Sequence, residues 1–142
     1  MASITFKAAV IILGLIFLLA LPSGLATAQQ AEVIAGGELE YQNACAVCHG
    51  GDARGNGIMS PYLTAKPANL RRLTLTPGGS FPFWQVYRKI DGQLEIRSHG
   101  TRDMPIWGDR FRAQAGGDGK SGRTQAAGRI LSLVFYLQHL QE

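Results

Sequence analysis

The sequence predicts an all-α fold. Three segments carry helical patterns, at about 37–45, 82–90 and 124–141. No segment alternates apolar and polar residues with the period of two that a half-buried strand requires. The chain has 142 residues and no internal repeat, which is room for one domain. We therefore expect a single helical domain without a sheet.

Each helix is predicted by a different signal. The first follows the flexible pair Gly36-Gly37 and ends near Cys45. The second can be capped by Ser80 and end at Gly92, with a proline suited to its first turn. The third has the clearest apolar stripe at helical spacing, made of Ile130, Leu133, Val134, Leu137 and Leu140.

The connecting segments are rich in residues that favour turns. Residues 50–69 contain many Gly, Pro and Asn residues, and 74–80 includes a Pro-Gly-Gly turn. Residues 113–122 contain four glycines and almost no apolar side chain. We therefore expect 113–122 to form a flexible Gly-rich surface loop.

Residues 1–28 have the pattern of a secretory signal peptide. Lys7 precedes 14 uncharged residues, 8–21, and Ala26-Thr27-Ala28 is a small-residue cleavage site. Cleavage would remove the single charge of this segment and leave residues 29–142, which are 114 residues with a net charge of +3 instead of +4. The alternative is a retained membrane anchor, but a spanning helix needs ~20 apolar residues. Secretion predicts a periplasmic location, or a membrane-anchored protein that faces the periplasm if the segment is kept.

Cys45-Ala46-Val47-Cys48-His49 is a C-x-x-C-H motif, which is typical of haem c attachment. The two thiols would add to the two vinyl groups of one haem and form thioether bonds. His49 would then lie below the iron as its proximal ligand. Thus the motif predicts one covalently bound haem held by Cys45, Cys48 and His49.

Three other uses of the cysteine pair must be weighed. A thioredoxin-type redox centre usually lies near a βαβ pattern, which this sequence lacks. A zinc site needs four ligands, and only His99 and His139 remain as nitrogen donors. A plain disulfide would leave the adjacent His49 unexplained. Two cysteines allow one bridge at most, which excludes a scaffold of several disulfides.

Met104 is the expected second axial ligand of the iron. It lies 55 residues after His49, which leaves enough chain to reach the opposite face of a haem, and Pro105 would stiffen the loop. Met59 lies only ten residues after His49, and His99 is the next alternative. A thioether favours ferrous iron, so His/Met ligation would raise the reduction potential.

These features together resemble the class I cytochromes c of the bacterial periplasm, small proteins with one haem. The resemblance covers nearly all of residues 36–141 and rests on the C-x-x-C-H motif, on Met104-Pro105 and on the residues Gly37, Tyr41, Leu133 and Tyr136. It implies a cytochrome c-like fold of three to four helices around the haem. It also implies that the first and last helices cross at near right angles.

The resemblance further implies that a backbone carbonyl, often of a proline, holds the proximal histidine. Pro61 and Pro67 are both candidates, and the sequence does not decide between them.

The resemblance implies a function in electron transfer rather than catalysis. With both axial positions filled, the protein would carry one electron between a redox donor and a redox acceptor, which dock transiently. It would be a monomer or a complex subunit, because the same haem could serve a subunit of a larger periplasmic dehydrogenase or membrane oxidase complex. A haem enzyme or gas sensor with an open distal site is a third possibility. No long basic run indicates nucleic-acid binding.

Other residues are candidates for the surroundings of the haem. Aromatic side chains could wall its pocket: Phe81, Phe83, Trp84 and Trp107. Arginines could pair with its propionates: Arg71, Arg72 and Arg102. Near the distal loop, four basic residues are set against three acidic ones: Arg97, Arg102, Arg110 and Arg112 against Glu95, Asp103 and Asp109. This near balance predicts only a modest salt dependence of partner binding.

Overall fold

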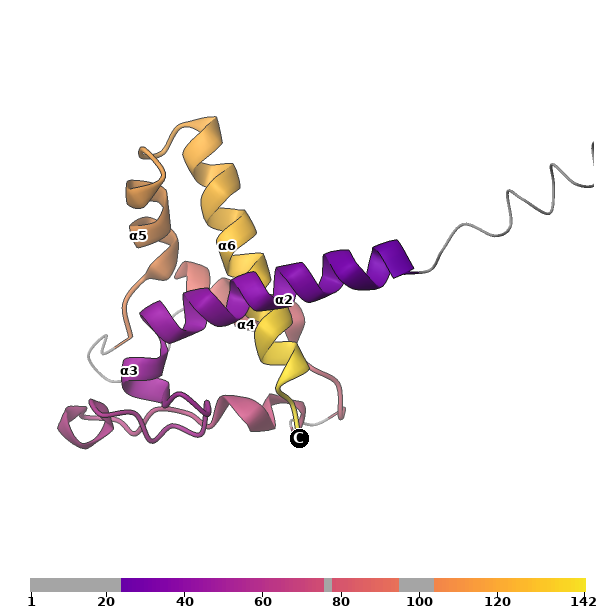
Figure 1. Cartoon of the computed structure of the whole chain (residues 1–142). Coiled ribbons are helices and arrows are strands. Elements are labelled where there is room, and N and C mark those ends of the chain that lie inside the picture. Colours follow the sequence, from indigo (N-terminus) through magenta and orange to yellow (C-terminus); the bar gives the residue numbers. More distant parts are fainter. Residues whose placement is uncertain (1–23, 76–77, 95–103) are drawn as a thin grey trace, which may run out of the picture. The chain divides into compact units, whose positions relative to one another are not determined.

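The computed structural model describes residues 24–75, 78–94 and 104–142. All regular elements among these described residues are helical, which confirms the all-α prediction. By its internal contacts the chain divides into residues 1–31 and residues 32–142, and the packing below is that of the second unit. With the labels of Figure 1, the elements are α2 (Gly24–Ala44), α3 (Ala46–His49), η1 (Ser60–Tyr62), η2 (Leu70–Leu75), α4 (Phe83–Asp91), α5 (Trp107–Gln114) and α6 (Lys120–His139).

Helices α2 and α6 cross at Gly37 (Figure 1). A Cβ atom at Gly37 would collide with the carbonyl group of Ser132 and would lie 2.9 Å from the Cβ of Tyr136. One turn further along α2, the rings of Tyr41 and Tyr136 pack with their centroids 5.4 Å apart. The absence of a side chain at Gly37 therefore lets the two backbones touch.

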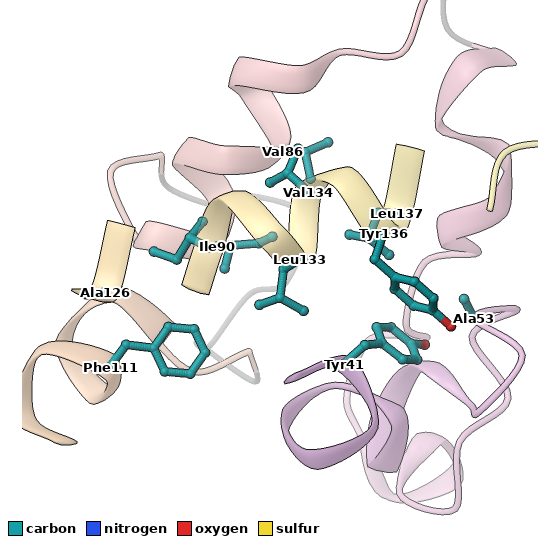
Figure 2. Close-up of a cluster of buried hydrophobic side chains, with 11 residues drawn as sticks. Tyr41, Ala53, Val86, Ile90, Phe111, Ala126, Leu133, Val134, Tyr136 and Leu137 are labelled. Atoms are coloured by element: carbon teal, nitrogen blue, oxygen red, sulfur yellow. The ribbon is translucent and has the colours of Figure 1, made fainter. Parts of the chain in front are cut away.

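The core lies along α6. Figure 2 shows side chains of α4, α5 and the α2–α3 region around it. The predicted stripe is confirmed for Ile130, Leu133, Val134 and Leu137, which are all buried, whereas Leu140 follows the end of α6 and is only partly buried. Phe111 of α5 is buried against them, and the guanidinium group of Arg129 stacks 3.9 Å from the centre of its ring.

The predicted start of the first helix was wrong, and so was the predicted N-cap of the second. Helix α2 begins at Gly24 and passes through the expected cleavage site, because residues 29–35 favour helix and Gly36-Gly37 lie inside the helix rather than before it. Helix α4 begins at Phe83, with Pro82 at its N-cap and no side-chain cap from Ser80. Its end is as expected, because Gly92 adopts the left-handed conformation with φ of 90°.

The predicted loop 113–122 is shorter in the structure. Helix α5 continues to Gln114 and α6 already begins at Lys120, so only residues 115–119 lie between them. Within α6, Gly122 is buried against the backbone of Gly117, which closes the connection tightly. Helix α5 was missed because Phe111 is its one buried large side chain and its other residues are mostly polar.

The segment predicted as a signal peptide lies largely outside the described residues, as do His99 and the part of the distal loop before Met104. No helix of the described residues is long and apolar enough to cross a membrane.

Candidate functional site

The C-x-x-C-H motif lies where α2 gives way to the short helix α3. The backbone N–H of Cys45 donates to the carbonyl of Tyr41 at 2.8 Å and so completes α2. The carbonyl of Cys45 in turn accepts the N–H of His49 at 2.9 Å. One helical turn therefore holds both thiols and the imidazole.

Two adjoining hollows open beside this turn, and Cys45, His49 and Met104 line both of them. The smaller has a cavity volume of about 40 Å³ and is also lined by Cys48 and Trp107. The larger has a cavity volume of about 240 Å³ and is lined mainly by apolar residues of α4, α6 and η2.

The structure thus brings together the four residues predicted to hold a haem. Met104 lies beside the motif although 55 residues separate it from His49. Met59, the alternative methionine, is 40% exposed and lines neither hollow. His139 ends α6 and lines neither hollow either. An apolar hollow with two thiols, an imidazole and a thioether on its wall fits a haem in its donor chemistry.

The ring of His49 is held by a backbone carbonyl, but not by that of a proline. Its Nδ1 lies 3.1 Å from the carbonyl oxygen of Ala68, to which a protonated Nδ1 donates. Pro61 and Pro67 were the expected candidates, so the prediction missed by one residue. The carbonyl of Pro67 instead faces Gly55, whose φ of 80° and missing side chain allow this close approach. With Nδ1 bonded to Ala68, Nε2 is the nitrogen that would coordinate iron.

Tyr41 connects α2 to the turn that follows the motif. Its hydroxyl donates a buried hydrogen bond of 2.6 Å to the carbonyl of Gly50, the residue after His49. Burial raises the pKa of the Tyr41 hydroxyl, so the phenol stays protonated and remains a donor. The position of His49 is thereby fixed from the side of α2 as well as from Ala68.

The pKa of the Cys45 thiol does not favour the redox alternative. Burial, with smaller contributions from Glu40 and Cys48, raises the pKa of the Cys45 thiol to about 12. Reactive redox cysteines have lowered pKa values instead. Cys45 and Cys48 are not joined by a disulfide. Among the described residues, no three His, Cys, Asp or Glu side chains are grouped as they would be around a metal ion.

Of the aromatic residues expected to wall the pocket, only Trp107 lines a hollow. Trp84 is 65% exposed, and Phe81 and Phe83 belong with it to an aromatic cluster on α4. Phe135 of α6, which is 39% exposed, packs on Phe83 in the same cluster.

Lys89 is the basic residue at the larger hollow, and it was not among the residues predicted from the sequence. Arg71 is paired with Glu142 at 2.8 Å and Arg72 is exposed, while Arg102 lies outside the described residues. Lys89 and Gln85 of α4 line the hollow instead. Their spacing of four places them on one side of the helix next to Val86 and Ile90, and this pattern is visible in the sequence.

The charges near the distal loop are largely paired within the chain. Arg112 contacts Asp91 at 3.4 Å and Asp118 at 3.1 Å, and it also pairs with Asp109. Arg110 stacks over the ring of Trp107 at 5.2 Å. Arg97, Glu95 and Asp103 lie outside the described residues.

Neither a protein-family model nor a curated protein nor a solved structure matches the chain. The functional argument therefore depends on the residues of the site.

Proposed function

We propose that the mature chain is a periplasmic electron-transfer protein with one haem c, of the class I cytochrome c kind. One observation carries the proposal: the cysteines and histidine of the C-x-x-C-H motif and Met104 line the same apolar hollow. Cys45 and Cys48 would hold the haem through thioether bonds, and His49 Nε2 and the Met104 sulfur would be the iron ligands. When bound, the haem supplies an iron centre that changes oxidation state by one electron.

The chain's own residues would keep this centre rigid and largely dry. The Ala68 carbonyl orients the imidazole of His49, and the bond from Tyr41 fixes the adjacent turn. Leu133, Leu137 and Val86 line the larger hollow with apolar side chains, which would disfavour water beside a bound haem. A rigid, apolar site favours electron transfer because little has to reorganise when the charge of the iron changes.

The test is the spectrum and the intact mass of protein produced in an oxidising compartment with haem-attachment machinery. The mass should show one covalent haem and a chain that begins at Gln29. Ferric protein should show the weak long-wavelength band typical of a Met–iron bond. Met104→Ala should lose this band, whereas the matched variant Met59→Ala should keep it. Absence of covalent haem would refute the proposal, and a band that persists in Met104→Ala would exclude Met104 as ligand.

The ferrous protein also tests the third functional class. A six-coordinate carrier should bind carbon monoxide weakly, because Met104 must first be displaced. Tight binding by the native protein would support a haem enzyme or gas sensor instead.

A complex subunit is the second candidate, and the aromatic cluster favours it. The rings of Trp84 and Phe135 both pack on Phe83, and both are partly exposed. Such a patch is typical of surfaces that another protein covers. Copurification of a larger subunit would support this role, and a stable monomer isolated from the native source would contradict it.

A further inference from the structure

Gln141 and Glu142, which follow α6, bind η2, the helix that begins two residues after Ala68. The amide oxygen of Gln141 accepts the backbone N–H groups of Leu73 at 2.8 Å and Thr74 at 3.1 Å. Its amide nitrogen donates to the carbonyls of Leu70 at 2.7 Å and Leu137 at 2.6 Å. All four hydrogen bonds that a glutamine side chain can make are therefore used. Gln141 joins the end of α6 to η2 by one fully satisfied amide.

Glu142 reinforces this junction. Its backbone N–H donates to the carbonyl of Arg71 at 2.9 Å. Its carboxylate pairs with Arg71 at 2.8 Å and with Arg54 at 2.5 Å. Arg71 belongs to η2 and Arg54 belongs to the loop that follows His49. The carboxylate of Glu142 therefore connects η2 with this loop.

This junction lies two residues from the carbonyl that holds the imidazole. Leu70, whose carbonyl accepts from Gln141, also donates its own N–H to the carbonyl of Ala53 at 2.8 Å. The backbone that carries the Ala68 carbonyl is therefore held on its C-terminal side from two directions. The contact between Gly55 and Pro67 holds it on the other side.

From this geometry we propose that Gln141 is a positioning residue for His49. It acts through η2 to keep the Ala68 carbonyl in hydrogen-bond contact with Nδ1. The inference rests on the proposed function insofar as His49 is an iron ligand. A firm Nδ1–H···O bond makes the imidazole a stronger electron donor to a bound metal. Loosening it should favour the ferrous state and raise the reduction potential.

Gln141→Leu tests the proposal, because it keeps a similar volume and removes all four hydrogen bonds. Gln138→Leu is the matched control, since Gln138 is exposed on α6 only three residues earlier. We expect the Nδ1 proton of His49 to exchange with solvent about tenfold faster in Gln141→Leu. We also expect a higher midpoint potential. Both values should be unchanged in Gln138→Leu.

Faster exchange of the Leu73 amide alone would show a purely local role for Gln141. The proposal is therefore overturned if the His49 proton and the potential stay at their wild-type values while the Leu73 amide exchanges faster. If Gln141→Leu does not fold, Gln141→Glu serves the same purpose, because it keeps the acceptor but loses the donor to Leu70.

The outcome can be separated from that of the proposed function. If the wild-type mass shows no haem, the proposed function fails, and the exchange of the His49 proton still decides the positioning role. If the haem is attached and Gln141→Leu has no effect on proton or potential, only the positioning role fails.

Discussion

The adjacent glycines Gly36 and Gly37 should respond to alanine with opposite signs. Both lie inside α2, where alanine favours a helix over glycine by roughly 0.5–1 kcal/mol. At Gly36 no atom lies within 4 Å of the added Cβ position, so the full gain should appear. At Gly37 the Cβ would strike the backbone carbonyl of Ser132, which cannot turn away as a flexible side chain would.

Relief of that collision requires α2 and α6 to move apart. Overpacking of this kind costs about 1–3 kcal/mol, which exceeds the gain in helix propensity. Gly37→Ala should therefore lower the free energy of unfolding by roughly 0.5–2 kcal/mol, whereas Gly36→Ala should raise it by up to about 1 kcal/mol. Thermal unfolding followed by circular dichroism measures both changes, because the melting temperature should shift by about 4 °C for each kcal/mol. Equal stabilisation by the two variants would refute the crossing at Gly37.

Two further predictions concern hydrogen bonds near the site. Tyr41→Phe should lower the free energy of unfolding, measured in urea, by about 1 kcal/mol. The Gly50 carbonyl loses the hydrogen bond from the phenol but keeps the one from the Ala53 N–H. An unchanged urea midpoint would contradict this. The hydrogen bond from Arg71 holds the pKa of Glu142 below its usual 4.5, so the carboxylate should stabilise the fold above pH 4.5 and lose this effect as the pH falls through the lowered pKa. The difference in stability between wild type and Glu142→Gln should be small, because the side chain is exposed, and it should shrink as the pH falls. A difference that grows on acidification would contradict the predicted direction of the pKa shift.

The parts of the fold that the sequence predicted depend on local patterns. The stripe of α6 is a repeat of apolar residues, and burial of Ile130 and Leu133 follows directly from its spacing. The C-x-x-C-H motif likewise places three chemical groups within one helical turn. The distance along the chain from His49 favoured Met104 over Met59, and of these two methionines Met104 is the one that lines the hollows beside the motif.

The parts that the sequence did not predict depend on contacts between distant segments. Ala68 has no polar side chain, and its role comes only from where its backbone carbonyl lies, 19 residues from His49. Gln141 resembles any polar residue at a helix end until its contacts to residues 70–74 are known. Helix α5 was missed for a related reason, since its buried side depends mainly on Phe111.

The distribution of buried side chains connects the fold with the proposed haem. The largest fully buried residues are Tyr41, Phe111, Ile130, Leu133 and Val134, and all of them lie on or against α6. The elements α3 and η2 bury no residue of their own, although residues of both line the hollows. Segments of this kind must gain their apolar contacts elsewhere, because ordering the backbone costs about 1–2 kcal/mol per residue. A covalently attached haem between α3, α4 and η2 would supply those contacts, so the C-x-x-C-H motif would complete the core as well as provide the redox centre.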